Sequence, residues 1–214
     1  MISPKLFYSP GACSLAPHIA LEETGEPFEP VLVDTKTGVH REPPYLRINP
    51  KARVPALAIG DWVLTENPAL LQFIARSYPD AGLWPEDLRA QAKAMEWLAW
   101  IASTVHVAYA HVRRAERYAT SEAALADVRA KGLDASRDLW RAIERQVGAG
   151  PWVLGERYTV VDAYLFVFWL WGQGPALQLP MAEFCPAWTA QARAMGKRPA
   201  VQRALAREQI AFPT

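Results

Sequence analysis

The chain has 214 residues, of which 51% are hydrophobic and 21% are charged, and its formal net charge is +1. Residues 1–80 carry 7 basic and 9 acidic side chains, which leaves 16 and 13 for the remainder, so neither half has the single-sign field of a protein that binds nucleic acid or a membrane surface. Two cysteines make no disulfide framework and no signal segment opens the chain, so we expect a soluble protein of the reducing cytoplasm.

The first 80 residues hold 11 of the 18 prolines and alternate short elements with turns. Their patterns predict a strand, a helix that Gly25 ends, a second strand, and a hairpin around Gly60-Asp61. In chain order these elements are Lys5–Tyr8, Cys13–Thr24, Val31–Val33, Ala56–Ile59 and Trp62–Thr65. A further helix opens at Glu66-Asn67-Pro68, with Asn67 as the expected N-cap and Pro68 in the first turn. This order predicts an α/β domain, a small mixed sheet with helices on its faces.

The rest of the chain is dominated by helical patterns. We expect long helices at Leu88–Tyr118 and Ser121–Val147, and a final helical stretch, Pro186–Gln209, that breaks at Arg198-Pro199. Thr159-Val160-Val161-Asp162 has the form of a capping box. The apolar run after it, Ala163–Trp171, is too short to span a membrane and indicates a buried helix. The expected domains are therefore 1–80, a linker at 81–87, and an all-helical domain at 88–214.

Cys13 is the first candidate for chemistry, because it follows a strand and a Gly-Ala turn where a helix is expected to begin. Unpaired N–H groups at a helix start favour an anion, so the thiol is expected to be accessible and more acidic than free cysteine. The alternative is a small buried hydrophobic residue. That alternative is the one we favour for Cys185. The pair Arg113-Arg114 is interpreted as a solvated helix face.

Three further positions have a functional and a structural interpretation. Val54-Pro55, if cis, would turn the backbone of Val54 outward to pair with a peptide-like ligand. Glu66-Asn67 would offer a carboxylate and free amides to an amino-acid headgroup, or simply cap a helix. His106 shares a helix face with Ala99, Ser103 and Ala110 and would line a cleft, or be structural.

These segments together resemble the beta-class bacterial glutathione transferases. The resemblance rests on five motifs in the family's order, spread over almost the whole chain: Tyr8–Ile19, Asn49-Pro50 with Val54-Pro55, Leu64-Thr65-Glu66, Glu96-Trp97-Leu98 leading to Val105-His106, and Tyr158–Leu165. It implies a thioredoxin-like N-terminal domain, an all-α C-terminal bundle, a homodimer, and glutathione as co-substrate without a metal. The implied activity is transfer of the glutathione thiolate to a hydrophobic electrophile, as in detoxification.

The resemblance also implies a role for each matching residue. Cys13 would contact the glutathione sulfur, and Val54 would pair with the cysteinyl backbone beside a cis Pro55. Glu66 and Asn67 would hold the γ-glutamyl end, and Lys36 would lie on the glycine carboxylate side. Ser103 and His106 would help fix or activate the thiol, while the electrophile would lie near Trp100 and Tyr109. Ala99 and Asn67 depart from the commoner residues of the family.

Two other functions are compatible with these residues. One is a glutathione-dependent thiol–disulfide reductase, in which Cys13 is the nucleophile; because Ala16 stands three places further on, it would work with a single cysteine. The other is a protein that binds glutathione without turnover.

Overall fold

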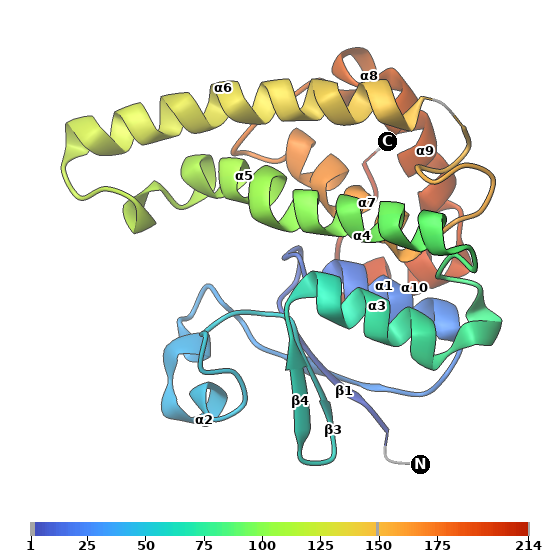
Figure 1. Ribbon diagram of the computed structural model, residues 1–214. Helices are drawn as coiled ribbons and strands as arrows, with labels where there is room; N and C mark the ends of the chain where they lie inside the picture. Colours follow the sequence, from blue (N-terminus) through green and yellow to red (C-terminus); the bar gives the residue numbers. More distant parts are fainter. Residues whose placement is uncertain (1–2, 149, 214) are drawn as a thin grey trace.

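The computed structural model describes residues 3–148 and 150–213 (Figure 1). A four-stranded mixed sheet has the order β2-β1-β3-β4, with β1 parallel to β2 and antiparallel to β3, and β3 antiparallel to β4. The strands are β1 (Lys5–Tyr8), β2 (Glu29–Leu32), β3 (Ala56–Ile59) and β4 (Trp62–Thr65). The prediction of a small mixed sheet is confirmed, and only β2 begins earlier than expected, at Glu29 instead of Val31.

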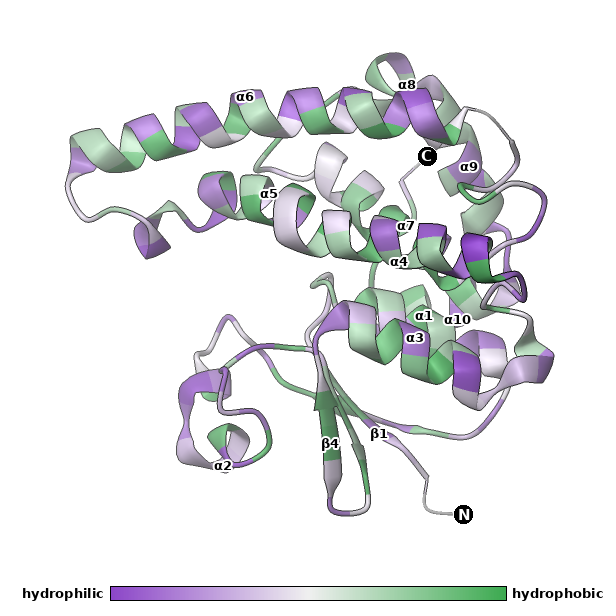
Figure 2. Ribbon diagram, viewed as in Figure 1, coloured by the Kyte–Doolittle hydropathy of each residue, from purple (hydrophilic) through white to green (hydrophobic). Residues whose placement is uncertain are grey.

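Both faces of the sheet are covered, because successive strand residues point to opposite sides. Leu6 and Leu57 belong to the core shared with α1 (Leu15–Thr24) and α3 (Asn67–Ser77), whereas Phe7 packs on the other face against Tyr45 of α2 (Pro43–Leu46). The part of α1 that is visible in Figure 2 is mostly green, and the residues of this helix from Leu15 to Glu22 are all buried. It ends as predicted at Gly25, which takes a left-handed φ of 72° that favours glycine.

The chain after α3 is helical among the described residues. Short 3-10 turns lie at Pro79–Ala81 and Ala115–Arg117, and another, Val39–Arg41, lies before α2 in the sheet region. The helices are α4 (Leu88–Trp100), α5 (His106–Arg113), α6 (Glu122–Val147), α7 (Val160–Gln173), α8 (Met181–Phe184), α9 (Pro186–Gly196) and α10 (Pro199–Arg207). The predicted helix over 121–147, the break at Arg198-Pro199 and the capping box are confirmed; in the capping box the Asp162 carboxylate accepts from the Thr159 N–H at 2.8 Å.

The prediction of one continuous helix over Leu88–Tyr118 is wrong. A π-helical turn occupies Ile101–Val105 between α4 and α5, and the helix ends at Arg113, because Arg114 leaves helical geometry with φ −140° and ψ 40°. A π turn places an extra residue in one turn, which rotates everything after it relative to a regular helix. The apolar pattern carries no signal for such an insertion.

The sheet region and the helical region meet along α1. In Figure 1 α10 lies beside α1, and α7 lies behind α4; α1 packs against both α7 and α10. Arg198, which precedes α10, and Arg203 within it form ion pairs of 2.6 Å with Glu23 and Glu22 of α1, respectively. A single hydrophobic core runs through both regions. Residues 81–87 join the regions, and the division into domains at that segment stays a prediction. No helix of the described residues has the length and apolar character needed to cross a bilayer.

Candidate active site

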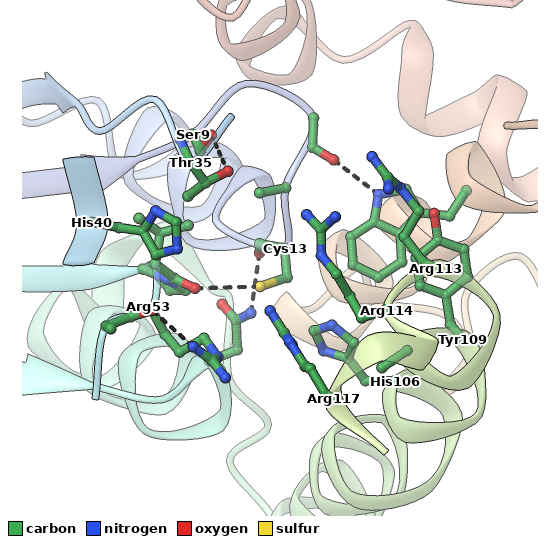
Figure 3. A pocket seen from close by; sticks show the side chains of 18 of the residues that line it. Ser9, Cys13, Thr35, His40, Arg53, His106, Tyr109, Arg113, Arg114 and Arg117 are labelled. Atoms are coloured by element: carbon green, nitrogen blue, oxygen red, sulfur yellow. Dashed lines mark hydrogen bonds between the residues drawn. The ribbon is translucent and has the colours of Figure 1, made fainter. Parts of the chain in front are cut away.

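A cavity of about 820 Å³ lies between the loops of the sheet region and the helical region (Figure 3). Its walls come from the β1–α1 loop, the segments around residues 35–41 and 49–55, the β4–α3 junction, the π turn with α5, and α7. It brings together eight of the ten residues expected at the site: Cys13, Lys36, Val54, Pro55, Glu66, Asn67, His106 and Tyr109. The structure does not bring Ser103 and Trp100 to this cavity.

Cys13 lies in the turn before α1, two residues ahead of the first helical residue, Leu15. Its side chain is partly exposed to the cavity, and its Sγ donates to the Val54 carbonyl at 3.5 Å. Burial raises the pKa of the Cys13 thiol to about 12, and the hydrogen bond from the Asn67 side chain opposes this only in part. The expectation of an acidic thiol is therefore wrong for this structure, because desolvation of the thiolate outweighs the hydrogen bonds that favour it.

Val54-Pro55 is a cis peptide bond, as the functional interpretation required. Arg53, the residue before this peptide bond, is held by two side chains. The Tyr45 hydroxyl and the Asn49 amide donate to its carbonyl at 2.6 and 2.7 Å. Within the described residues, the hydrogen bonds of Val54 outside the sheet involve its carbonyl alone, through Cys13. The Val54 N–H is therefore available to a ligand backbone.

The β4–α3 junction differs in one respect from the expectation. Helix α3 begins at Asn67, so the N-cap is Glu66, with φ 78° and ψ 123° and no side-chain cap. Glu66 is exposed, and its carboxylate pairs with Lys51 Nζ at 2.7 Å. Asn67 is buried, and its amide donates to the Cys13 carbonyl at 3.1 Å. The Asn67 side chain thus fixes the Cys13 turn instead of capping a helix.

The helical wall of the cavity carries His106 and Tyr109 from α5. Tyr109 stacks on Trp171 of α7, with ring centroids 4.4 Å apart, and the Trp171 indole donates to the Gly11 carbonyl at 2.9 Å. Burial, assisted by the charge of Arg117, lowers the pKa of His106 to about 4. His106 is therefore a neutral imidazole at pH 7, and it lies edge-on to Trp171 at 5.1 Å.

Ser103 and Trp100 lie elsewhere for identifiable reasons. The π turn changes the face that α4 shares with α5, so Ala102 lines the cavity and Ser103 is exposed beside Thr104. Trp100 packs edge-on against Trp97, at 5.4 Å between ring centroids.

Several cavity residues were missed by the sequence interpretation. Trp171 was assigned to a buried helix, and Arg113-Arg114 to a solvated face, but all three line the cavity. Arg53 and Arg117 line it as well, and Figure 3 shows these arginines reaching toward the space in front of Cys13. The close spacing of Arg113, Arg114 and Arg117 was a visible signal, but the pattern alone does not say which way that face points.

A small mixed sheet with an appended helical region, and a cavity that joins a cis-proline loop, a cysteine turn and a helix N-terminus, are typical of the thioredoxin-fold proteins that carry a helical domain. Residues 3–76 match the family model of the glutathione S-transferase N-terminal domain. The chain is 37% identical over 207 residues, covering 95% of this chain and 98% of the relative, to glutathione S-transferase GstA of Escherichia coli O157:H7. The chain belongs to the glutathione S-transferase family.

Two solved structures agree with this assignment. A glutathione transferase homologue from Sulfitobacter with bound glutathione is 38% identical with a TM-score of 0.89, over 97% of this chain and 99% of that one. A beta-class glutathione S-transferase from Sphingomonas chungbukensis is 33% identical with a TM-score of 0.83, over 97% and 100% of the two chains. The beta-class resemblance is thereby confirmed.

Proposed function

We propose that this protein conjugates glutathione, as its thiolate, to hydrophobic electrophiles in the cavity between the sheet region and the helical region. The observation that carries the proposal is the pairing of two opposed walls. One wall offers peptide-pairing groups and a carboxylate, from Val54 and Glu66, around the Cys13 thiol. The other is aromatic, built from Tyr109 on Trp171. A small-molecule site needs polar groups that fix the orientation of a ligand and apolar surface that covers its body, and the two walls offer one each.

Glutathione would lie along the first wall. Its cysteinyl backbone would pair with Val54 as a short added strand, and its γ-glutamyl ammonium would meet Glu66, displacing Lys51. The γ-glutamyl carboxylate would meet the amides at the start of α3. Its glycine carboxylate would lie toward Lys36, which is exposed at the cavity edge. This geometry directs the glutathione sulfur toward Cys13 and the aromatic wall.

Cys13 acts in this proposal as a hydrogen-bond donor. A thiol whose pKa is raised to about 12 stays protonated at neutral pH, so it can turn from the Val54 carbonyl to donate to the glutathione thiolate. His106, neutral with its pKa lowered to about 4, would donate from a ring N–H in the same way. Donors aimed at a sulfur anion lower its energy without becoming charged themselves.

The reductase alternative needs Cys13 itself as a thiolate, and the raised pKa disfavours it. The test is a pair of assays on one preparation, one for conjugation of 1-chloro-2,4-dinitrobenzene and one for reduction of a glutathione mixed disulfide. We expect conjugation to dominate and to survive in part in Cys13→Ser. Disulfide reduction without conjugation would overturn the proposal, and binding without either activity would identify a binding protein.

The proposal includes a cytoplasmic homodimer with a role in detoxification. Support for the dimer comes from the apolar side chains that β4 leaves exposed, Trp62 at 47% and Val63 at 36%. An exposed edge strand with apolar residues invites pairing or cover. Sedimentation at micromolar concentration should give twice the chain mass of 23.8 kDa, and a single 23.8 kDa species would contradict the dimer.

A further inference from the structure

Basic side chains converge on the mouth of the cavity from both regions of the fold. Arg113 ends α5, Arg114 follows it, and Arg117 lies in the 3-10 turn beyond. From the opposite side come Arg41 and Arg53 of the sheet region. All five line the cavity, and Figure 3 shows Arg53 and Arg117 pointing toward one another across it.

These guanidinium groups have no carboxylate partner among the described residues, since none of the five takes part in an ion pair there. Partial desolvation lowers the pKa of Arg117, whose side chain remains exposed, and the charges of Arg53 and Arg114 lower it further. The same cluster, after burial, lowers the pKa of His40. Like charges gathered in this way repel one another unless an anion lies between them.

Glutathione does not supply enough negative charge to balance the cavity. Six cationic side chains line it, the five arginines and Lys36, against two carboxylates, Glu66 and Glu116, so four positive charges are in excess. Glutathione has two carboxylates and one ammonium, and therefore brings a net charge of about −1, or about −2 as the thiolate. An excess of positive charge remains when glutathione is bound.

The aromatic wall lies beside this excess charge. Tyr109 precedes Arg113 by one helical turn, and Val107, which is 38% exposed, lines the same side of the cavity. A molecule with its flat apolar body against the edge of the Tyr109–Trp171 stack would place a substituent among Arg113, Arg114 and Arg117. Arginine forks match a carboxylate through two parallel hydrogen bonds.

We propose that the preferred electrophile of this enzyme is an organic anion, a flat apolar body that carries a carboxylate held by Arg114 and Arg117. The inference rests on the proposed function and specifies its second substrate. With a chlorodinitrobenzene as the electrophile, the glutathione thiolate attacks the chlorine-bearing ring carbon, the carbon–sulfur bond forms, the carbon–chlorine bond breaks, and chloride leaves. The thiol proton passes to solvent.

The experiment compares 4-chloro-3,5-dinitrobenzoate with its methyl ester, which has the same reacting carbon and lacks the charge. We expect the ratio of kcat/KM for the benzoate to kcat/KM for the ester to fall at least tenfold in Arg114→Gln/Arg117→Gln. The ratio in the wild type should also fall as ionic strength rises. Arg89→Gln is the matched control, because Arg89 is exposed at the start of α4 and does not line the cavity. An unchanged ratio in the double variant overturns the inference.

The ester and a binding measurement separate this inference from the proposed function. Absence of conjugation with either compound would count against the proposed function alone, and equilibrium binding then decides the inference. Calorimetry with 3,5-dinitrobenzoate, on enzyme saturated with S-methylglutathione, should show binding that weakens at least tenfold in the double variant. Arg117→Gln alone, an exposed position, serves as a second variant if the double variant melts early. Binding that is absent, or equal in all variants, overturns the inference.

Discussion

The Glu208 carboxylate accepts a hydrogen bond from the Gly11 backbone N–H at 2.9 Å, and so joins the end of α10 to the turn that carries Cys13. Its other oxygen lies 2.7 Å from His18 Nδ1 in α1, and the side chains of both residues are fully buried. Gly11 takes a φ of 69°, which favours glycine. The last helix of the chain therefore fixes the position of a loop at the start of the chain.

This contact predicts that Glu208→Gln destabilises the fold and weakens glutathione binding together. We expect the free energy of unfolding to fall by about 1–3 kcal/mol, because the substitution disturbs the buried contacts that the Glu208 carboxylate makes with the Gly11 N–H and His18. Urea denaturation measures the loss, and calorimetry measures glutathione affinity. Glu183→Gln on the exposed side of α8 is the control. Equal midpoints for the Glu208 variant and wild type would show that the network contributes nothing.

Substitutions of Glu66 should weaken glutathione binding without lowering the stability of the fold. Glu66→Gln is expected to weaken glutathione about tenfold or more, through loss of a charge-assisted hydrogen bond to the γ-glutamyl ammonium. The exposed pair with Lys51 contributes little to stability, so the fold should tolerate the change. Glu66→Gly should bind as weakly but be at least as stable as wild type, because φ 78° suits glycine. Unchanged affinity in both variants would remove Glu66 from the site.

Cys13 should react slowly with alkylating reagents at neutral pH. Burial raises its pKa to about 12, so the midpoint of iodoacetamide modification should lie well above the value of about 8.5 for free cysteine. The measurement uses a Cys185→Ala background, so that Cys13 is the one thiol that can be modified. A midpoint at or below that of free cysteine would restore the acidic thiol and favour the reductase alternative.

His106 should make stability depend on acidity. The pKa of His106 is about 4 in the folded protein and about 6.5 in the unfolded chain. Neutral His106 therefore makes its full contribution to the free energy of unfolding above pH 6.5. That contribution is lost as pH falls from 6.5 toward 4, by up to about 3 kcal/mol, and changes no further below 4. Denaturation of wild type and His106→Gln across this range gives the difference. A difference in the free energy of unfolding between the two proteins that does not change with pH would contradict the lowered pKa.

Local patterns in the sequence determined much of the architecture. The hairpin over 56–65, the stop at Gly25 and the capping box at Thr159 depend on residues a few positions apart, and the structure has all three. The ordered motifs around Cys13, Val54 and Glu66 likewise predicted which loops meet at the cavity. Turn chemistry and helix caps act over one or two turns of chain, so a single sequence carries them.

Only the tertiary structure decided the protonation state of the site residues and the orientation of their side chains. The acidity of Cys13 depends on how deeply neighbouring segments bury it, and the face that Arg114 presents depends on the π turn at Ile101–Val105. The contact between Gly11 and Glu208 joins positions at opposite ends of the chain. Desolvation and long-range contacts are sums over residues distant in sequence, and so no local pattern determines them.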